Sequence, residues 1–188
     1  MDAIEAITQR VSVAQLTGPE ITPVQKEILF KAAMRAPDHA WMRPSRYLTI
    51  EGDAHLKLGE IFYRSQCEKE DLSEEKGLKA RNMLMRAPLV IVAITNIQEH
   101  FKVPRDEQIL STGAGVQNML IAAHAMGLGA IWRTGAMAEC EAVKAALGLA
   151  EHELITAFLY VGHINTTPKA VPEVDLTAYV REWTGEIG

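Results

Sequence analysis

Cysteine is scarce in this sequence, and long hydrophobic runs are missing. Only Cys67 and Cys140 are present among 188 residues, and they form no CxxC pair. Neither a disulfide framework nor a cysteine-based zinc site is therefore expected. No apolar run approaches the roughly 20 residues of a membrane span. The acidic start, residues 1–5, lacks the basic and apolar regions of a secretory signal. These absences predict a cytoplasmic protein.

The short motifs of nucleotide binding, hydrolysis and metal binding are also missing. There is no P-loop and no GxGxxG, and Gly113-Ala114-Gly115 lies inside a predicted helix instead of between a strand and a helix. No GxSxG elbow indicates a serine hydrolase. The six histidines show no HExxH or other ligand spacing, so a metal site is not expected. The net charge of −5 argues against nonspecific nucleic-acid binding.

The composition that remains predicts one globular domain. Hydrophobic residues make up 48% of the chain and charged residues 23%, as in ordinary soluble proteins. A chain of this length buries roughly 70% of its unfolded surface. Residues 1–188 are therefore expected to form a single domain, without repeats or linkers.

Capping residues mark the first helices. Asp2 can cap a short helix that ends near Gln9, and Thr22 with Gln25 predicts a capping box for a second helix that ends near Arg35. Asp53 can cap a third helix. The expected buried stripe of the second helix consists of Val24, Ile28, Leu29 and Ala32. The charged stretch 65–81 is interpreted as a solvated helical face.

Four apolar segments predict strands. Residues 46–51 alternate between apolar and polar, and residues 88–95 form a β-branched run typical of a strand buried on both faces. Residues 130–132 and 153–161 are the other two, while 15–21 is expected to be a loop. With a helix at 138–147, this order is not strict βαβ alternation, so the class is α+β.

The longest predicted helix, residues 107–126, is apolar nearly all the way round. Such a helix is normally buried on every side, which here requires other helices or a second subunit. Gly113 and Gly115 each cost the helix about 1 kcal/mol, and close packing would explain them. The extended C-terminal tail also indicates a partner subunit, because a long tail rarely survives proteolysis unless something holds it.

Residues 34–40 end the second helix and open a loop. Pro37 disfavours helical backbone at Ala36, so Arg35 and His39 are displayed on either side of a forced turn. Alone, this pair is a solvated helix end that faces the helix dipole favourably. Other polar groups at element ends are Arg10, Ser12, Arg133 and Thr134. Arginines so placed also suit phosphate binding.

Five segments of the chain form a characteristic ordered set. They are residues 1–12, Met34-Arg35-Ala36-Pro37-Asp38-His39, Val103-Pro104-Arg105 with Glu107-Gln108, Ile131-Trp132-Arg133 with Gly135, and Phe158-Leu159-Tyr160-Val161-Gly162. In this order and spacing the set resembles the nitroreductase family of FMN-dependent oxidoreductases, especially its short members. The resemblance implies an α+β fold with a central mixed or antiparallel sheet flanked by helices. It also implies an intertwined homodimer with FMN in each of two interface sites, and a C-terminal tail that packs on the partner.

The resemblance also implies roles for individual residues. FMN contacts are implied for Arg10, Val11, Ser12, Arg35, His39, Ile131, Trp132 and Arg133. Arg35 and His39 would reach the flavin of the other subunit, and Arg133 would suit its phosphate. Ile121 and Met126 would receive the nicotinamide of NAD(P)H, although core packing explains these two equally well. The implied reaction is ping-pong hydride transfer from NAD(P)H through FMN to a nitro, quinone or related acceptor.

Three departures from the family pattern keep alternatives open. Val11 stands where a second arginine is common, Arg43-Pro44-Ser45 replaces Gln-Pro-Trp, and Asp106 replaces an aromatic residue. A flavin-binding module or sensor without turnover is therefore an alternative to the oxidoreductase. A third hypothesis is a nonflavin interaction protein that dimerises through the long helix.

Overall fold

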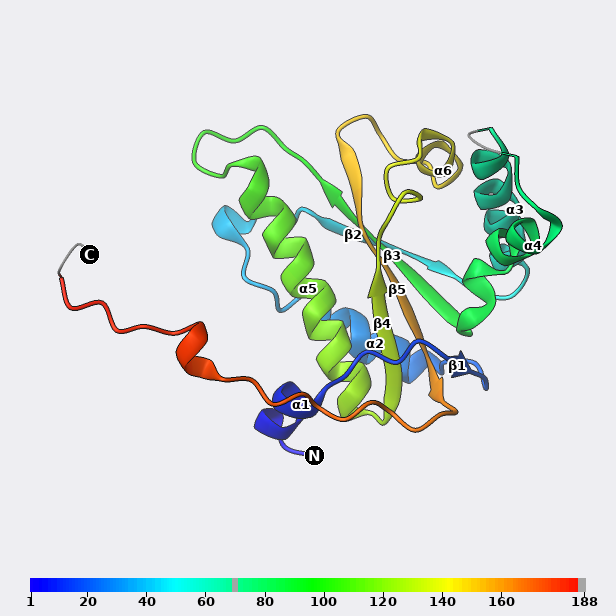
Figure 1. Cartoon of the computed structure of the whole chain (residues 1–188). Coiled ribbons are helices and arrows are strands. Elements are labelled where there is room, and N and C mark those ends of the chain that lie inside the picture. Colours follow the sequence, from blue (N-terminus) through cyan, green and yellow to red (C-terminus); the bar gives the residue numbers. More distant parts are fainter. Residues whose placement is uncertain (69–70, 186–188) are drawn as a thin grey trace.

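The computed structural model describes residues 1–68 and 71–185. Its centre is an antiparallel sheet with helices on both faces (Figure 1). The strands are β1 (Leu16–Thr17), β2 (Ser45–Ile50), β3 (Leu89–Asn96), β4 (Leu128–Arg133) and β5 (Glu153–Ile164). β5 pairs with β3, β4 and β1, and β2 pairs with β3. The α+β class predicted from the sequence is confirmed, and of the two sheet types that the resemblance implied, mixed or antiparallel, the sheet is antiparallel.

Six α-helices and three short 3₁₀ turns are present in the described residues. The helices are α1 (Ala3–Gln9), α2 (Pro23–Ala33), α3 (Asp53–Cys67), α4 (Glu74–Arg81), α5 (Arg105–Ala125) and α6 (Glu141–Ala146). The turns are η1 (His39–Trp41), η2 (Met83–Arg86) and η3 (Leu176–Ala178). None of these helices is both long enough and apolar enough to cross a lipid bilayer.

The two sides of β3 face two separate hydrophobic clusters. Val90, Val92 and Ile94 pack in one cluster with side chains of α3 and α6. The alternate residues Leu89 and Ile91 pack in the other with side chains of α2 and α5. Because successive side chains of a strand point to opposite faces, the continuous apolar run predicted here is the signature of a strand covered on both sides.

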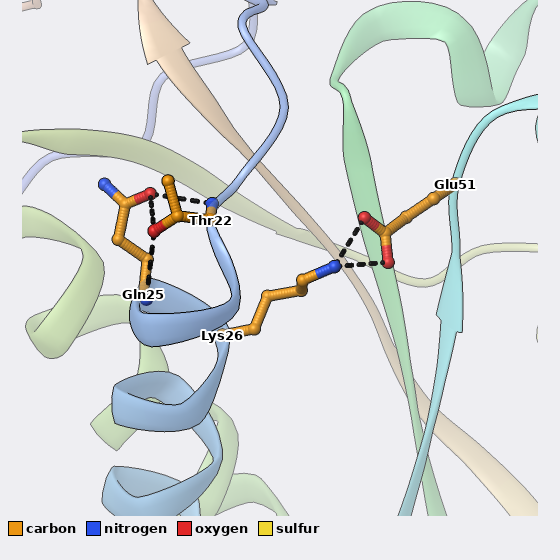
Figure 2. A network of polar contacts seen from close by, with 4 residues as sticks. All are labelled: Thr22, Gln25, Lys26 and Glu51. Atoms are coloured by element: carbon orange, nitrogen blue, oxygen red, sulfur yellow. Dashed lines mark hydrogen bonds and ion pairs between the residues drawn. The ribbon is translucent and has the colours of Figure 1, made fainter.

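The start of α2 shows the predicted capping box (Figure 2). The Thr22 hydroxyl accepts from the Gln25 backbone N–H at 3.3 Å, and Gln25 Oε1 accepts from the Thr22 backbone N–H at 2.9 Å. One residue further on, Lys26 Nζ lies 3.0 and 2.9 Å from the two Glu51 carboxylate oxygens. The cap fixes where α2 begins, and the ion pair ties that end of the helix to the end of β2.

Several sequence predictions need correction. Gly52, not Asp53, is the N-cap of α3, and residues 16–17 form a short strand instead of loop. Val24 and Ile28 are 65% and 41% exposed, so they are not a buried stripe in the single chain. Leu29 and Ala33 are the buried residues of α2. The pattern located the apolar residues but could not tell a core-facing stripe from an exposed apolar face.

α5 is buried on one side only in the single chain. Val116, Met119 and Ala123 are fully buried, whereas Leu110 is 70% exposed. A Cβ added at Gly115 would lie 2.8 Å from the Tyr47 hydroxyl and 3.1 Å from the Ala33 carbonyl oxygen. The expectation that close packing accounts for a glycine is thus confirmed at Gly115. At Gly113 an added Cβ would meet only the Trp132 ring, at 3.4 Å.

This contrast predicts opposite effects for two neighbouring substitutions. Gly115→Ala should lower the free energy of unfolding by about 2 kcal/mol, because overpacking displaces α2 or β2. Gly113→Ala should leave it unchanged or raise it by up to about 1 kcal/mol, the helix propensity gained over glycine. Urea unfolding of the two variants measures both values, and equal destabilisation would contradict the packing assigned to Gly115.

The C-terminal segment extends away from the body of the molecule (Figure 1). Apart from η3, residues 165–185 have no regular structure and are exposed, with Tyr179 at 79% and Trp183 at 83%. The charged segment behaves largely as predicted, since α4 is mostly exposed while Gly77 and Ala80 face inward. Lys69 and Glu70 lie outside the described residues.

Candidate functional site

The segment after α1 runs beside β4. The Val13 N–H donates to the Ala130 carbonyl at 3.1 Å, which holds residues 10–13 against the strand. Arg10 and Val11 line a small cavity together with Leu120 and His124 of α5. Arg10 Nη1 and His124 Nε2 are buried without a hydrogen-bond partner. Ser12 is exposed beside this cavity.

The last three residues of β4, Ile131, Trp132 and Arg133, are all predicted site residues, and their side chains lie on both faces of the sheet. Ile131 packs on the cluster that includes α3, and Trp132 on the cluster that includes α5. The Trp132 indole N–H donates to the Thr156 carbonyl at 3.2 Å. The Arg133 guanidinium carbon lies 5.8 Å from the centre of the Tyr160 ring. The arginine is therefore on the same sheet face as Ile131 and Tyr160.

Arg133 lies between two hollows. One is lined by side chains of α3, η2 and β5, among them Phe62, Met83 and Tyr160, and by Thr134 and Gly135 after β4. The other is lined by residues 14–16, Arg86 and Asn165. The Arg133 Nε atom is buried without a hydrogen-bond partner. A buried guanidinium without an acceptor is costly to maintain, so this atom marks a place where an acceptor from a ligand would fit.

Arg35 and His39 lie at the C-terminal end of α2 and in the loop after it. Arg35 lines an apolar groove on the exposed face of α2 with Ile28, Phe30 and Met34. His39 Nδ1 lies 2.6 Å from a Glu107 carboxylate oxygen at the start of α5. This contact anchors the loop and fixes the orientation of the imidazole.

The loop itself has an unusual backbone. Ala40, Trp41 and Arg43 all have positive φ, at 57°, 56° and 46°. Positive φ is uncommon outside glycine and costs energy that the surroundings must offset. Two contacts offset it: the Asp38 carboxylate accepts from the Arg43 N–H at 2.8 Å, and the Ser111 hydroxyl donates to the Pro37 carbonyl at 2.8 Å. Trp41 is 80% exposed as a result.

Within one chain these residues form three separate groups. Arg10 and Val11 line one cavity, Arg133 lines two others, and Arg35 and His39 line none of the three. Ile121 is half-buried on α5, and the adjacent Leu120, not Ile121, lines the Arg10 cavity. Met126 packs on the core cluster that includes α5. Core packing therefore accounts for Met126 in the single chain.

Sequence reasoning missed His124, Arg86 and Tyr160 as lining residues. His124 lies three residues after Ile121, so helical spacing was an available signal for it. Arg86 is the last residue of η2, two residues short of the buried strand β3, and is another cation at the end of an element. Tyr160 lies in a segment that carries the resemblance, but it was given no role of its own because it follows the apolar pattern of β5. The described residues contain no group of histidine, cysteine and carboxylate side chains suited to hold a metal ion.

Sequence relatives align with most of this chain. A family model described as "Nitroreductase family" matches residues 7–163. The chain is 39% identical over 163 residues to "Putative NAD(P)H nitroreductase YdjA" of Escherichia coli K12, covering 86% of this chain and 88% of that protein. It is 36% identical, over the same shares, to "Putative NAD(P)H nitroreductase" of Haemophilus influenzae.

Solved structures share the fold at lower identity. A nitroreductase-like family protein from Bacillus cereus superposes with a TM-score of 0.83 at 23% identity, covering 98% of this chain and 97% of its own. A structure from Desulfovibrio desulfuricans, described as "a putative nitroreductase in complex with fmn", has a TM-score of 0.74 at 22% identity and 97% coverage of both chains. The family model covers most of the chain and the fold agrees, so the chain belongs to the nitroreductase family.

Proposed function

We propose that the chain is an FMN-dependent NAD(P)H oxidoreductase that reduces a nitro, quinone or related electron-poor acceptor. The observation that carries this is that Arg10 and Arg133, which line separate cavities near β4, each have a buried guanidinium nitrogen without a hydrogen-bond partner. Both belong to segments that the family model covers. The names of the E. coli and H. influenzae relatives support the use of NAD(P)H, and the D. desulfuricans complex supports FMN.

The residues around β4 fit the polar parts of a flavin mononucleotide. Arginine side chains bind phosphate and carbonyl oxygens through charge-assisted hydrogen bonds, and Arg10 Nη1 and Arg133 Nε each have a free donor. Arg10 and the exposed hydroxyl of Ser12 would hold polar groups of the cofactor, with Val11, Ile131 and Trp132 as apolar lining. When bound, FMN supplies the hydride acceptor and donor chemistry of a ping-pong cycle.

The protein's own contribution is binding, orientation and charge. No side chain has to act as a nucleophile, because the electron transfer belongs to the cofactor. A positive charge near the reduced ring system stabilises the charge that develops there, and Arg10, Arg35 and Arg133 are the candidates. We place the nicotinamide of NAD(P)H near Ile121 and Met126, toward the end of α5. We place the enzyme itself in the cytoplasm, as the cysteine pattern predicts.

A homodimer completes the proposed site. α2 exposes an apolar face with Val24, Ile28 and Met34, and Trp183 of the extended tail is 83% exposed. Exposed apolar patches of this kind mark interaction sites. A second copy of the chain would cover this face, hold the tail, and bring Arg35 and His39 toward the partner's flavin. Light scattering of the purified protein measures the expected mass of two chains.

The function has a direct test. The purified protein should be yellow or take up FMN on incubation, and anaerobic mixing with NADH or NADPH should bleach it rapidly. A protein that stays colourless after incubation with FMN would refute the proposal. Bound flavin that neither nucleotide bleaches would instead favour a binding module without turnover. Ser45 motivates that alternative, because its hydroxyl donates to Thr112 at 3.0 Å and lines none of the cavities around β4.

Arg35→Ala should lower the affinity for FMN about tenfold while leaving the dimer intact. One charge-assisted hydrogen bond to a ligand contributes roughly 1.5 kcal/mol, and Arg35 sits at the rim of the α2 groove. Fluorescence titration with FMN measures the affinity, and light scattering the mass. Lys31→Ala is the matched control, because Lys31 lines the same groove and its side chain is 75% exposed. Equal FMN affinity in the Arg35 variant and the parent would show that Arg35 does not serve the flavin.

A further inference from the structure

A second arginine shares a hollow with Arg133. Ala14, Gln15, Leu16, Arg86, Arg133 and Asn165 line this hollow, which contains about 890 Å³ of empty space including its open side. Arg86 is the last residue of η2, separated from β3 by Ala87 and Pro88, and Arg133 is the last residue of β4. β3 and β4 both pair with β5, one on each side. Two guanidiniums distant in sequence thus reach the same space across β5.

Both positive charges are uncompensated. No carboxylate lines the hollow. Within residues 1–68 and 71–185, neither guanidinium has a hydrogen-bond or ion-pair partner, and Arg133 Nε is buried. Some other arginines are paired with carboxylates, Arg46 with Glu153 and Arg81 with Glu60. Like charges that converge without a counter-ion repel each other, and an anion between them would remove that cost.

The positive charges of Arg86 and Arg133 both act on the hydroxyl group of Tyr160. Burial raises the pKa of its hydroxyl, and the charges of Arg133 and Arg86 oppose that rise. Tyr160 lines the adjoining hollow, which also contains Arg133. In the sheet register Tyr160 lies opposite Val90 on one side and Ile131 on the other. Both positive charges therefore act on Tyr160 of β5, and Arg133 lines both hollows.

We propose that Arg86 and Arg133 together bind a small oxyanion, a phosphate or carboxylate group, in this hollow. The guanidinium fork matches the two oxygens of such a group, and two forks from different elements, η2 and β4, can clamp it from both sides. Gln15 and Asn165 supply neutral donors at the rim. This inference deepens the proposed function, because the oxyanion has two candidate sources: the phosphate of FMN and the carboxylate of an anionic electron acceptor.

Titration with inorganic phosphate tests the site without relying on turnover. The full chain, freed of flavin, is titrated calorimetrically with phosphate at low ionic strength. Arg86→Ala should weaken binding at least tenfold, and Arg86→Lys should weaken it less, because lysine keeps the charge but loses the fork. Arg64→Ala is the control; Arg64 lies on α3 with its side chain 73% exposed, and its loss should leave the affinity unchanged. Circular dichroism melting confirms that each variant is folded.

Two further competition experiments identify which molecule supplies the oxyanion. If FMN displaces phosphate but riboflavin does not, and Arg86→Ala weakens FMN but not riboflavin, the oxyanion is the flavin phosphate. If phosphate still binds the FMN-saturated chain and 4-nitrobenzoate displaces it while 4-nitrobenzyl alcohol does not, the oxyanion belongs to the acceptor. Either result supports the site. No phosphate binding by the parent, or equal binding by the parent and Arg86→Ala, overturns it. A chain that binds phosphate but takes up no flavin would refute the proposed function and leave this site standing.

Discussion

Glu153→Gln is expected to lower the free energy of unfolding by about 2 kcal/mol at pH 7. The Glu153 carboxylate lies 2.6 Å from both Nε and Nη2 of Arg46, a bidentate pair, and it also accepts from the Ala150 N–H at 2.9 Å. The Glu153 side chain is only 8% exposed. The pair joins β2 to the start of β5 across β3, so it closes the end of the sheet. Glutamine keeps the shape but removes the charge that Arg46 faces.

The pH dependence follows from the same contacts. Hydrogen bonding to Arg46 is the main cause that lowers the pKa of Glu153 from 4.5 to about 2. A carboxylate with a depressed pKa in the folded state contributes stability above its unfolded pKa, and this is lost as the pH falls toward the folded value. The contribution should thus be full above about pH 4.5 and vanish near pH 2. The full shift would correspond to about 3.4 kcal/mol, which we reduce because Arg46 is more than a third exposed.

Urea unfolding of the parent and the variant between pH 2 and pH 7 measures this difference. The two stabilities should converge as the pH falls. Glu27→Gln is the control, since Glu27 forms an ion pair with Lys31 in which both side chains are more than 60% exposed. The free energy of unfolding of Glu27→Gln should equal that of the parent at every pH. A constant gap between the parent and Glu153→Gln would show that the variant acts through packing and not through the charge.

Periodicity and capping residues were enough to predict most of the fold. The Thr22–Gln25 capping box and the β-branched run before Thr95 each identify an element through local chemistry, and the structure confirms both. The face that an element buries was harder to predict. Val24 and Ile28 have helical spacing, but the side of α2 that meets the core depends on where α5 lies. Tertiary packing decides that, and no local pattern encodes it.

The site was predicted by resemblance more than by physical pattern. Arg10 and Arg133 are both at element ends, which is a local signal, and the structure gives each a buried unpartnered nitrogen. Arg86 has the same local signal but was not singled out, because its proximity to Arg133 depends on the pairing of β3 and β4 with β5. His39 was predicted as a flavin contact, and its pairing with Glu107, 68 residues away, could not be read from spacing. Long-range pairing is the information that one sequence lacks.

Arg10→Ala is expected to lower the affinity for FMN about a hundredfold. Arg10 Nη1 is buried in the cavity between residues 11–13 and α5 and has no hydrogen-bond partner. A charge-assisted hydrogen bond formed there would lie in a poorly solvated place, near the upper end of the usual 1.5–3 kcal/mol. That free energy corresponds to roughly a hundredfold in affinity. Fluorescence titration with FMN measures it, and Arg64→Ala again provides an exposed arginine as the control.

Thermal melting separates a binding role of Arg10 from a structural one. Without flavin, an unpartnered buried guanidinium destabilises the fold, so Arg10→Ala should melt at the same temperature as the parent or higher. With saturating FMN the parent should gain stability, because a ligand that binds only the folded state stabilises it by mass action. At the same FMN concentration the variant should gain much less, since its affinity is about a hundredfold lower. A variant that melts lower than the parent without flavin would show that Arg10 supports the fold, and the cavity beside β4 would then lose its assignment as part of the flavin site.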